Sequence, residues 1–155
     1  MAPRQPDTVD RIIQQWAEVR PRFDMSPIEL IGRVSRLSRL IDRRLNENFG
    51  EHGLQDWMYD VLATLRRRGP PYELTAGDLV AQTMVTTGAM TNRIDRLAAL
   101  GYVERRQGAD RRTVIVALTD AGRAKVDDVS TSHMDTERNL LDTLSPNQQD
   151  QLASL

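Results

Sequence analysis

Residues 74–122 read LTAGDLVAQTMVTTGAMTNRIDRLAALGYVERRQGADRRTVIVALTDAG. Two short segments with a helical spacing of apolar residues come first, and residues 85–88 join them. A short apolar segment at Tyr102 and Val103 follows, then a polar tip at 107–112 and five apolar residues at 114–118. The order is therefore helix, turn, helix, strand, charged loop and strand. This order predicts a winged helix-turn-helix, a fold whose second helix enters the major groove of double-stranded DNA.

The charge of the chain is distributed unevenly. The 155 residues carry a formal net charge of −1, so the whole molecule has no strong attraction for a polyanion. Between residues 84 and 112, however, six arginines stand against three acidic residues, and further acidic residues gather after position 119. This pattern indicates a basic DNA-binding face on a near-neutral protein, which suits a regulator that binds DNA and is released from it.

Several classes of protein are excluded by composition and spacing. The chain has no cysteine, which rules out a disulfide framework, a cysteine-ligated zinc site and a thiol redox sensor. It has no apolar run of about 18 residues and no apolar signal region, so we expect a cytoplasmic protein without a membrane partner. His52 and His133 lie far apart and outside any metal-ligand or triad spacing. We therefore predict that the protein is not an enzyme and has no catalytic residue, metal or cofactor.

Helical segments flank the central stretch on both sides. Apolar residues at 9, 12, 13, 16 and 19 predict a helix with Trp16 on its buried face. Ser26 is expected to cap a long helix that ends near Asn48, and residues 54–68 form a third helix. After the wing, Thr119 is expected to cap another long helix, and Ser145 a short one.

The terminal helices have apolar faces that one small winged domain cannot bury. A symmetric homodimer would cover them, and a monomer with its ends folded back is the alternative. The expected fold is mostly α with a small β-wing, a winged helix-turn-helix with flanking dimerisation helices. We assign residues 1–53 to N-terminal helices of the dimerisation region, 54–118 to the DNA-binding domain and 119–155 to C-terminal dimerisation helices.

A set of short motifs matches a known family. They are LT at 74–75, LVA at 79–81, TNRIDRL at 91–97, GYVER at 101–105 and DRR at 110–112, followed by LT at 118–119. The chain resembles the MarR family of winged-helix transcription regulators over nearly its whole length. The resemblance implies a homodimer, usually a repressor, on a palindromic operator.

The second helix of the motif is expected to read DNA. Such a helix needs short polar residues and arginine near its N-terminal half, where base edges are reached. We expect Arg96 to lie at the surface or on a phosphate, and four apolar residues, Met90, Ile94, Leu97 and Leu100, to pack in the core. The predicted base and phosphate contacts are Thr86, Thr87, Thr91, Asn92, Arg93 and Arg96.

The wing tip carries a second set of predicted DNA contacts. Arg112 is expected to enter the narrow minor groove, where the potential is most negative. Asp110 is two residues away and can pair with Arg112 across the tip, as the Asp-x-Arg pair does in the resembled family. Arg111 is expected to bind a phosphate. A solvated charged turn is the alternative interpretation.

A narrower resemblance is to the urate-responsive branch of the same family. That branch has a tryptophan on an extra N-terminal helix, a helix aspartate and two arginines, which fall here on Trp16, Asp60, Arg93 and Arg105. A ring to stack on and guanidinium groups to pair with suit a small anionic aromatic or carboxylate effector. The alternative is that Trp16 is a packing anchor and that Asp60 and Arg93 form an ordinary salt bridge.

The predicted function is a ligand-responsive transcription regulator, a repressor that binds a palindromic double-stranded operator as a homodimer. An architectural or constitutive DNA-binding protein without an effector is the main alternative, although such a protein is expected to be more basic than this chain. A dimerisation module that does not bind nucleic acid is a third interpretation, and the DRR motif at the wing argues against it.

Overall fold

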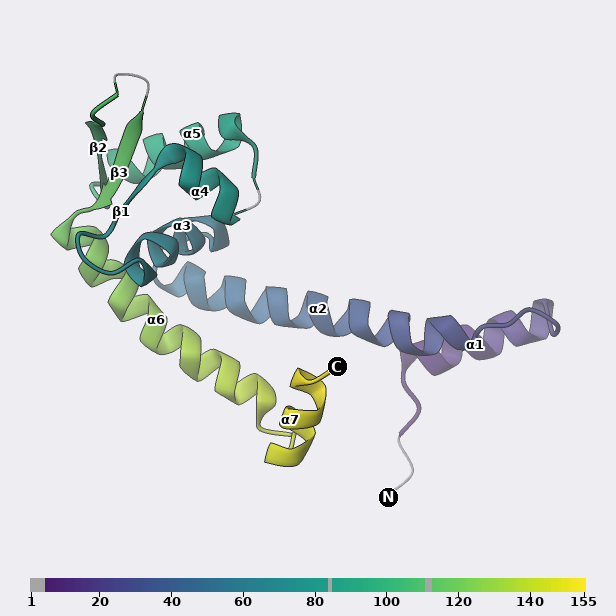
Figure 1. Cartoon of the computed structure of the whole chain (residues 1–155). Coiled ribbons are helices and arrows are strands. Elements are labelled where there is room, and N and C mark those ends of the chain that lie inside the picture. The colour runs from purple at the N-terminus through teal and green to yellow at the C-terminus, as the bar shows by residue number, and fades with distance from the viewer. Residues whose placement is uncertain (1–4, 84, 111–112) are drawn as a thin grey trace. The chain divides into compact units, whose positions relative to one another are not determined.

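The predicted order of elements is confirmed by the computed structural model, which describes residues 5–83, 85–110 and 113–155 (Figure 1). The chain is mostly helical and has a small antiparallel sheet, so the expected fold class is correct. It divides into two compact units, residues 1–44 and 45–155, and the division falls inside the second helix. The elements are α1 Thr8–Val19, α2 Ser26–Glu51, α3 Asp56–Arg67, β1 Glu73–Thr75, α4 Ala76–Thr83, α5 Thr87–Ala99, β2 Val103–Gln107, β3 Val114–Leu118, α6 Asp120–Leu141 and α7 Pro146–Ala153.

The sheet of the second unit has the strand order β1-β3-β2. The hairpin β2–β3 is the predicted wing, and its register pairs Val103 with Leu118 and Gln107 with Val114. The central strand β3 buries Val116 and Ala117, whereas β2 buries only its first residue, Val103. The base of the wing is therefore part of the core, and its outer half is held by strand pairing.

The core of the second unit lies between α3, α4, α5, the sheet and the first half of α6. Full burial of each leucine or isoleucine side chain contributes about 1.5–3 kcal/mol, so this cluster fixes α5 firmly. Leu100 was expected in the core and is instead 52% exposed, because it is the last residue before the chain turns away at Gly101, which has φ +75°. The most deeply buried members are Val61, Leu62, Leu65, Leu79, Met90, Ile94, Leu97, Val116, Val126 and Val129.

A tight joint connects the start of α6 to the loop before β2. Thr119 caps α6 as predicted, because its Oγ1 accepts a hydrogen bond from the Gly122 amide at 3.0 Å. The same hydroxyl donates to the Gly101 carbonyl at 2.7 Å, and the Thr119 amide donates to the Tyr102 carbonyl at 3.1 Å. A Cβ atom at Gly122 would lie only 1.9 Å from the Tyr102 oxygen. The joint therefore requires glycine at position 122, which the sequence analysis did not anticipate.

The two histidines serve the packing of α6 in this unit. His133 is buried against Phe49 and Tyr59, with ring centroids 5.1 and 4.9 Å away. His52 lies 3.1 Å from the Asp128 carboxylate through its Nδ1 atom. Both histidines thus connect α6 to residues 49–59. In the part of the chain that the structure describes, no three His, Asp or Glu side chains are grouped to hold a metal ion.

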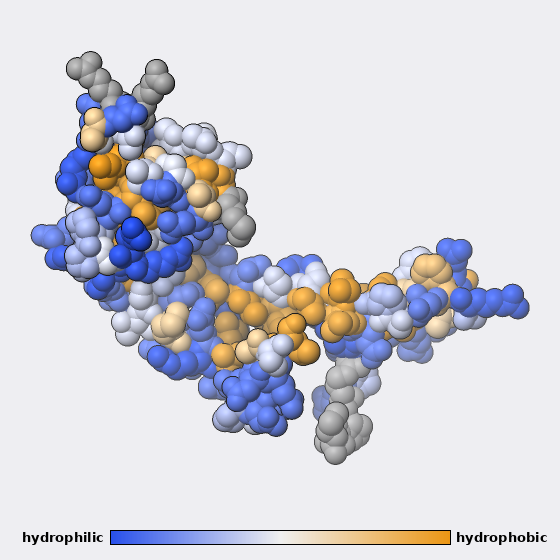
Figure 2. Space-filling view, in the orientation of Figure 1, coloured by the Kyte–Doolittle hydropathy of each residue, from blue (hydrophilic) through white to orange (hydrophobic). Residues whose placement is uncertain are grey.

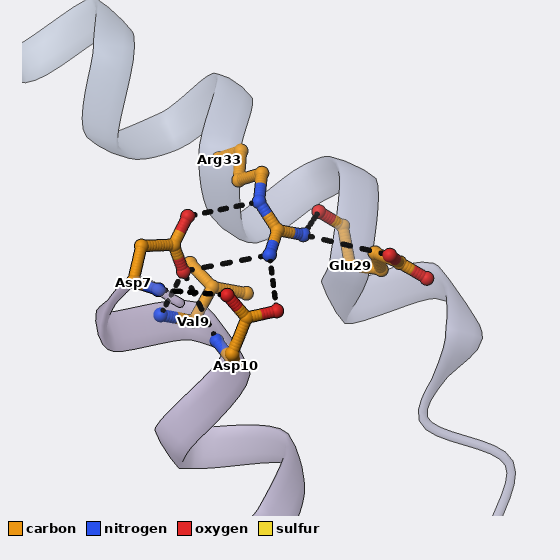
Figure 3. A network of polar contacts seen from close by, with 5 residues as sticks. All are labelled: Asp7, Val9, Asp10, Glu29 and Arg33. Atoms are coloured by element: carbon orange, nitrogen blue, oxygen red, sulfur yellow. Dashed lines mark hydrogen bonds and ion pairs between the residues drawn. The ribbon is translucent and has the colours of Figure 1, made fainter. Parts of the chain in front are cut away.

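One arginine anchors α1 in the first unit. Asp7 caps α1 in a capping box with Asp10, and the Arg33 guanidinium binds Asp7 at 3.0 Å and Asp10 at 2.6 Å (Figure 3). Hydrogen bonds from the Asp10 amide, above all, and from Arg33 lower the pKa of Asp7. Beside this network, Val9 packs closely on Gly32, where an added Cβ would lie 3.2 Å from the valine. The start of α1 is therefore bound to the first part of α2.

Two predictions about the first unit are wrong. Asp24, not Ser26, provides the hydrogen bond at the start of α2, since its carboxylate accepts from the Ser26 amide at 2.9 Å; the helix already begins at Ser26. Trp16 was expected on a buried face, but it is 42% exposed, because α1 rests on α2 through its first turn around Val9.

The first unit leaves much of its apolar surface uncovered. Among its described residues only Val9 and Met25 are buried hydrophobics, since two helices alone cannot cover both of their apolar faces. Figure 2 shows the apolar residues gathered along α2. None of the helices that the structure describes is both long and apolar enough to cross a membrane. The exposed apolar residues of this unit include Ile12, Val19, Phe23, Leu30, Ile31, Val34, Leu37 and Leu40.

Candidate nucleic-acid interface

Helix α5 has one face in the core and the other in solvent. Met90, Ile94 and Leu97 are at most 1% exposed and hold the helix in place. Burial of these three side chains turns the opposite face outward, as helical periodicity requires. Five predicted DNA contacts lie exposed on or at the start of the helix: Thr86, Thr87, Thr91, Asn92 and Arg96.

The threonine hydroxyls of α5 are already engaged with the backbone. Thr86 caps the helix and accepts from the Ala89 amide at 3.3 Å, whereas Thr91 donates to the Thr87 carbonyl at 3.1 Å. A hydroxyl has one donor and two acceptor positions, so each hydroxyl still has two positions for further partners. These bonds fix the direction of the hydroxyls and leave them available to a ligand.

The two predicted arginines of α5 share an aromatic partner that the sequence analysis did not identify. The guanidinium carbons of Arg93 and Arg96 lie 5.7 and 5.1 Å from the ring centroid of Trp57 on α3. Both distances are within the range of a cation–π interaction. The apolar spacing of residues 54–68 indicates only that Trp57 is one of the apolar residues on one face of α3. No local signal in the sequence points to the arginines.

Asp60 is a half-buried carboxylate on α3 that the charge of Arg93 reaches. Burial raises its pKa, while the positive charges of Arg93 and Arg67 act in the opposite direction and Asp56 adds a smaller increase. Among the described residues, Asp60 and Arg93 form no ion pair within 4.0 Å, so the ordinary salt bridge considered as an alternative is not formed. The positive charge of Arg93 therefore acts on Asp60 without an ion pair between the two side chains.

Arg105 lies on β2 and forms an ion pair with Asp95 of α5. No pattern in the sequence points to Asp95, and its ion pair with Arg105 connects α5 to the wing. Arg105 also borders a pocket of about 410 Å³ between the starts of α4 and α5 and the wing. The lining of this pocket comprises Thr75, Ala76, Gly77, Thr87, Thr91, Ile94, Arg105, Thr113 and Val114.

The wing tip is closed by backbone hydrogen bonds. The Thr113 amide donates to the Asp110 carbonyl, and the Gly108 amide donates to the Thr113 carbonyl, both at 2.9 Å. Arg111 and Arg112 lie outside the described residues, so the predicted pairing of Asp110 with Arg112 stays a prediction. Arg106, in contrast, serves the sheet, since it binds Glu73 of β1 at 2.9 Å.

The four residues of the predicted effector site belong to different parts of the chain. Asp60, Arg93 and Arg105 lie in the second unit, whereas Trp16 lies in the first. Within its own unit Trp16 is 6.4 Å from Phe23 between ring centroids, with the rings tilted by 37°. The grouping of all four around one ligand stays a prediction.

The fold and the exposed polar face of α5 define the chain as a winged helix-turn-helix protein. Residues 52–113 match the sequence profile of the MarR family. The chain is 39% identical to the HTH-type transcriptional regulator PecS of Dickeya dadantii (strain 3937) over 148 residues, which cover 95% of this chain and 89% of PecS. The protein belongs to the MarR family.

Solved structures agree with this assignment. A mutant of Escherichia coli MarR complexed with operator DNA is similar with a TM-score of 0.72 and 26% identity, over 90% of this chain and 93% of that chain. Wild-type MarR in its apo form has a TM-score of 0.69 and 27% identity, over 81% and 91% of the two chains. The names of relatives describe transcriptional regulators rather than enzymes, in agreement with the prediction from the sequence.

Proposed function

We propose that the protein is a transcription regulator that binds a palindromic operator, with α5 in the major groove and the wing at the adjacent minor groove. The observation that carries the proposal is the orientation of α5. Its apolar residues are locked in the core, and its short polar residues face solvent. The similarity to a MarR structure in complex with operator DNA supports operator binding.

The proposed binding form is a homodimer. The first unit exposes a long set of apolar side chains on α1 and α2, and Met134, Leu141 and Leu152 are exposed on α6 and α7. A second copy would cover such surfaces with a two-fold axis, and this axis matches a palindromic site. Sedimentation at micromolar concentration tests this part directly, since a monomer at that concentration contradicts it.

Operator binding is tested with a matched pair of threonine variants. Thr91→Val keeps the shape of the side chain on α5 and removes its hydroxyl; Thr131→Val does the same on α6, where the hydroxyl donates to the Asp127 carbonyl at 3.2 Å. Both variants lose the same kind of helix contact, but only Thr91 faces the proposed DNA. We expect operator affinity to fall roughly tenfold for Thr91→Val, within the usual 1–3 kcal/mol for a base contact, and to stay unchanged for Thr131→Val.

The salt dependence of binding gives a second test. If the dimer neutralises about eight phosphates, the logarithm of the binding constant should fall with the logarithm of the salt concentration at a slope near −7. Fluorescence anisotropy with a labelled operator fragment measures this slope. A slope near zero removes the DNA-binding proposal, whatever the fold.

We further propose that a small anionic aromatic or carboxylate effector releases the operator and that the protein acts as a repressor. Asp60 supports this proposal, because this half-buried carboxylate interacts electrostatically with Arg93 of α5. The charge of a ligand bound near Asp60 would therefore also act on α5, the helix that we place in the major groove. An effector shifts the binding equilibrium only by its differential affinity for the two states, so release requires tighter binding to the form that does not bind DNA.

Titration of urate and several phenolic acids into the operator complex tests the effector. Asp60→Asn should keep operator binding and blunt the response, because the ligand no longer meets a negative charge. Trp16→Phe should weaken ligand affinity and leave operator affinity nearly unchanged. If no anion releases the operator from the wild type, the alternative of a constitutive DNA-binding protein is correct.

A further inference from the structure

Trp57 on α3 has its side chain close to two arginines of α5. It is the second residue of α3, and its ring lies within 6 Å of the guanidinium groups of both Arg93 and Arg96. Its indole N–H donates to the Gln55 side chain at 2.5 Å. This hydrogen bond gives the ring a fixed support at the start of α3.

The two arginines depend on this ring for their placement. They are three residues apart and lie on neighbouring positions of one face of α5. Among the described residues, neither guanidinium has a carboxylate within 4.0 Å. A long side chain without such a partner loses much rotamer freedom when it binds a phosphate, and contact with a fixed ring removes part of that cost beforehand.

A guanidinium over a ring can still bind a phosphate. Its positive charge interacts with the ring face, and the N–H groups lie in the guanidinium plane and point outward from its edge. Contact with Trp57 is therefore compatible with simultaneous hydrogen bonds to an oxyanion. We therefore expect the ring to orient the two guanidinium groups for phosphate binding and not to compete with the phosphate.

We propose that Trp57 is a positioning residue for operator binding, which preorganises Arg93 and Arg96 toward the phosphates of the DNA. The proposal rests on the proposed DNA-binding function and adds a residue outside the helix-turn-helix to it. Because both arginines share one ring, a change that draws Arg93 away also alters the surroundings of Arg96. Asp60, one turn after Trp57 on the same helix, acts on Arg93 through its charge.

A graded series at position 57 separates the ring from simple packing. Cation–π strength decreases from tryptophan to phenylalanine and is absent in leucine. Each contact at an exposed site corresponds to a factor of about 2–5 in affinity. We expect Trp57→Leu to weaken operator binding roughly 5- to 30-fold and Trp57→Phe to fall between the leucine variant and the wild type.

Tyr72 provides the matched control. Its ring also lies close to two arginines, Arg66 at 5.0 Å and Arg123 at 5.6 Å, and neither arginine is on α5. Tyr72→Leu removes the same number of cation–π contacts from the same unit. We expect it to leave operator affinity within about twofold of the wild type, and circular dichroism of both variants reports whether the fold is retained.

A double-mutant cycle between Trp57→Leu and Arg96→Ala decides the mechanism. If the ring acts through the arginine, Arg96→Ala costs much less affinity in the leucine background than in the wild type. Additive effects, an unchanged affinity in Trp57→Leu or a gain in affinity would each overturn the proposal. If the leucine variant does not fold, the same cycle with Trp57→Phe gives the answer. Absence of operator binding by the wild type would instead contradict the proposed function itself.

Discussion

Substitution of Gly122 by alanine should destabilise the protein strongly. The added Cβ would lie 1.9 Å from the Tyr102 oxygen and 2.8 Å from its carbonyl carbon, so the backbone of α6 or of the loop before β2 must move by more than 1 Å. Overpacking of this kind costs about 1–3 kcal/mol or more. Alanine gains less than about 1 kcal/mol of helix propensity in return. The expected net loss is about 2 kcal/mol, or roughly 4–8 °C in Tm.

Thermal and urea unfolding followed by circular dichroism measure this loss. Gly50→Ala is the matched control, because Gly50 lies inside α2 and an added Cβ there meets no atom within 4 Å. It should stabilise the protein by up to about 1 kcal/mol. Operator affinity should also fall in Gly122→Ala, because the joint holds the base of the wing. If Gly122→Ala unfolds at the same temperature as the wild type, our account of this joint is wrong.

Asp60→Asn should raise Tm at pH 7, because burial raises the pKa of Asp60 in the fold and makes its charged form unfavourable there. The neutral form of Asp60 contributes its full stability below pH 3.8, and this contribution is lost as the pH rises through the folded pKa. The gain in Tm of the variant should therefore vanish at low pH. Equal Tm values for variant and wild type at pH 7 would contradict this. Arg33→Met should speed proteolytic cleavage between residues 20 and 25, because it removes the ion pairs that hold α1 on α2. Arg36→Met on the same helix should not change the cleavage rate. Since the pKa of Asp7 is lowered, the wild type should lose the same ion pairs as the pH falls below 3.8. Thr119→Ala should cost about 1 kcal/mol in urea unfolding by removing the cap of α6, and Thr119→Ser, which keeps the hydroxyl, should cost clearly less.

Local signals in the sequence were sufficient to predict most elements. The predicted capping residues Thr119 and Ser145 each accept a backbone amide in the structure as expected. Thr75 and Thr86 do the same at the starts of α4 and α5. The apolar spacing of α5 likewise predicted its buried face, with Leu100 as the exception. These features depend on neighbours within one or two helical turns, which a single sequence contains.

Contacts between distant elements were not predictable in the same way. Trp57 with the two α5 arginines, Asp95 with Arg105, and Gly122 against Tyr102 each depend on how closely two elements approach. Neither residue type nor spacing reports that distance. The exposure of Trp16 has the same origin, because an amphipathic pattern shows which face is apolar and not whether another surface covers it.

The wing illustrates how a proposed DNA contact can change without a change of the fold. After Val103, the remaining residues of β2 are all exposed, and the last registered pair is Gln107 with Val114. Of the residues beyond that pair, those that the structure describes, 108–110 and 113, contribute no side chain to the core, so insertions or deletions at the tip should be tolerated in evolution. Regulators with different tip lengths could arise from one scaffold in single genetic steps. For protein engineering, the tip is therefore the place where loop libraries can be exchanged to alter operator preference while the stability of the scaffold is retained.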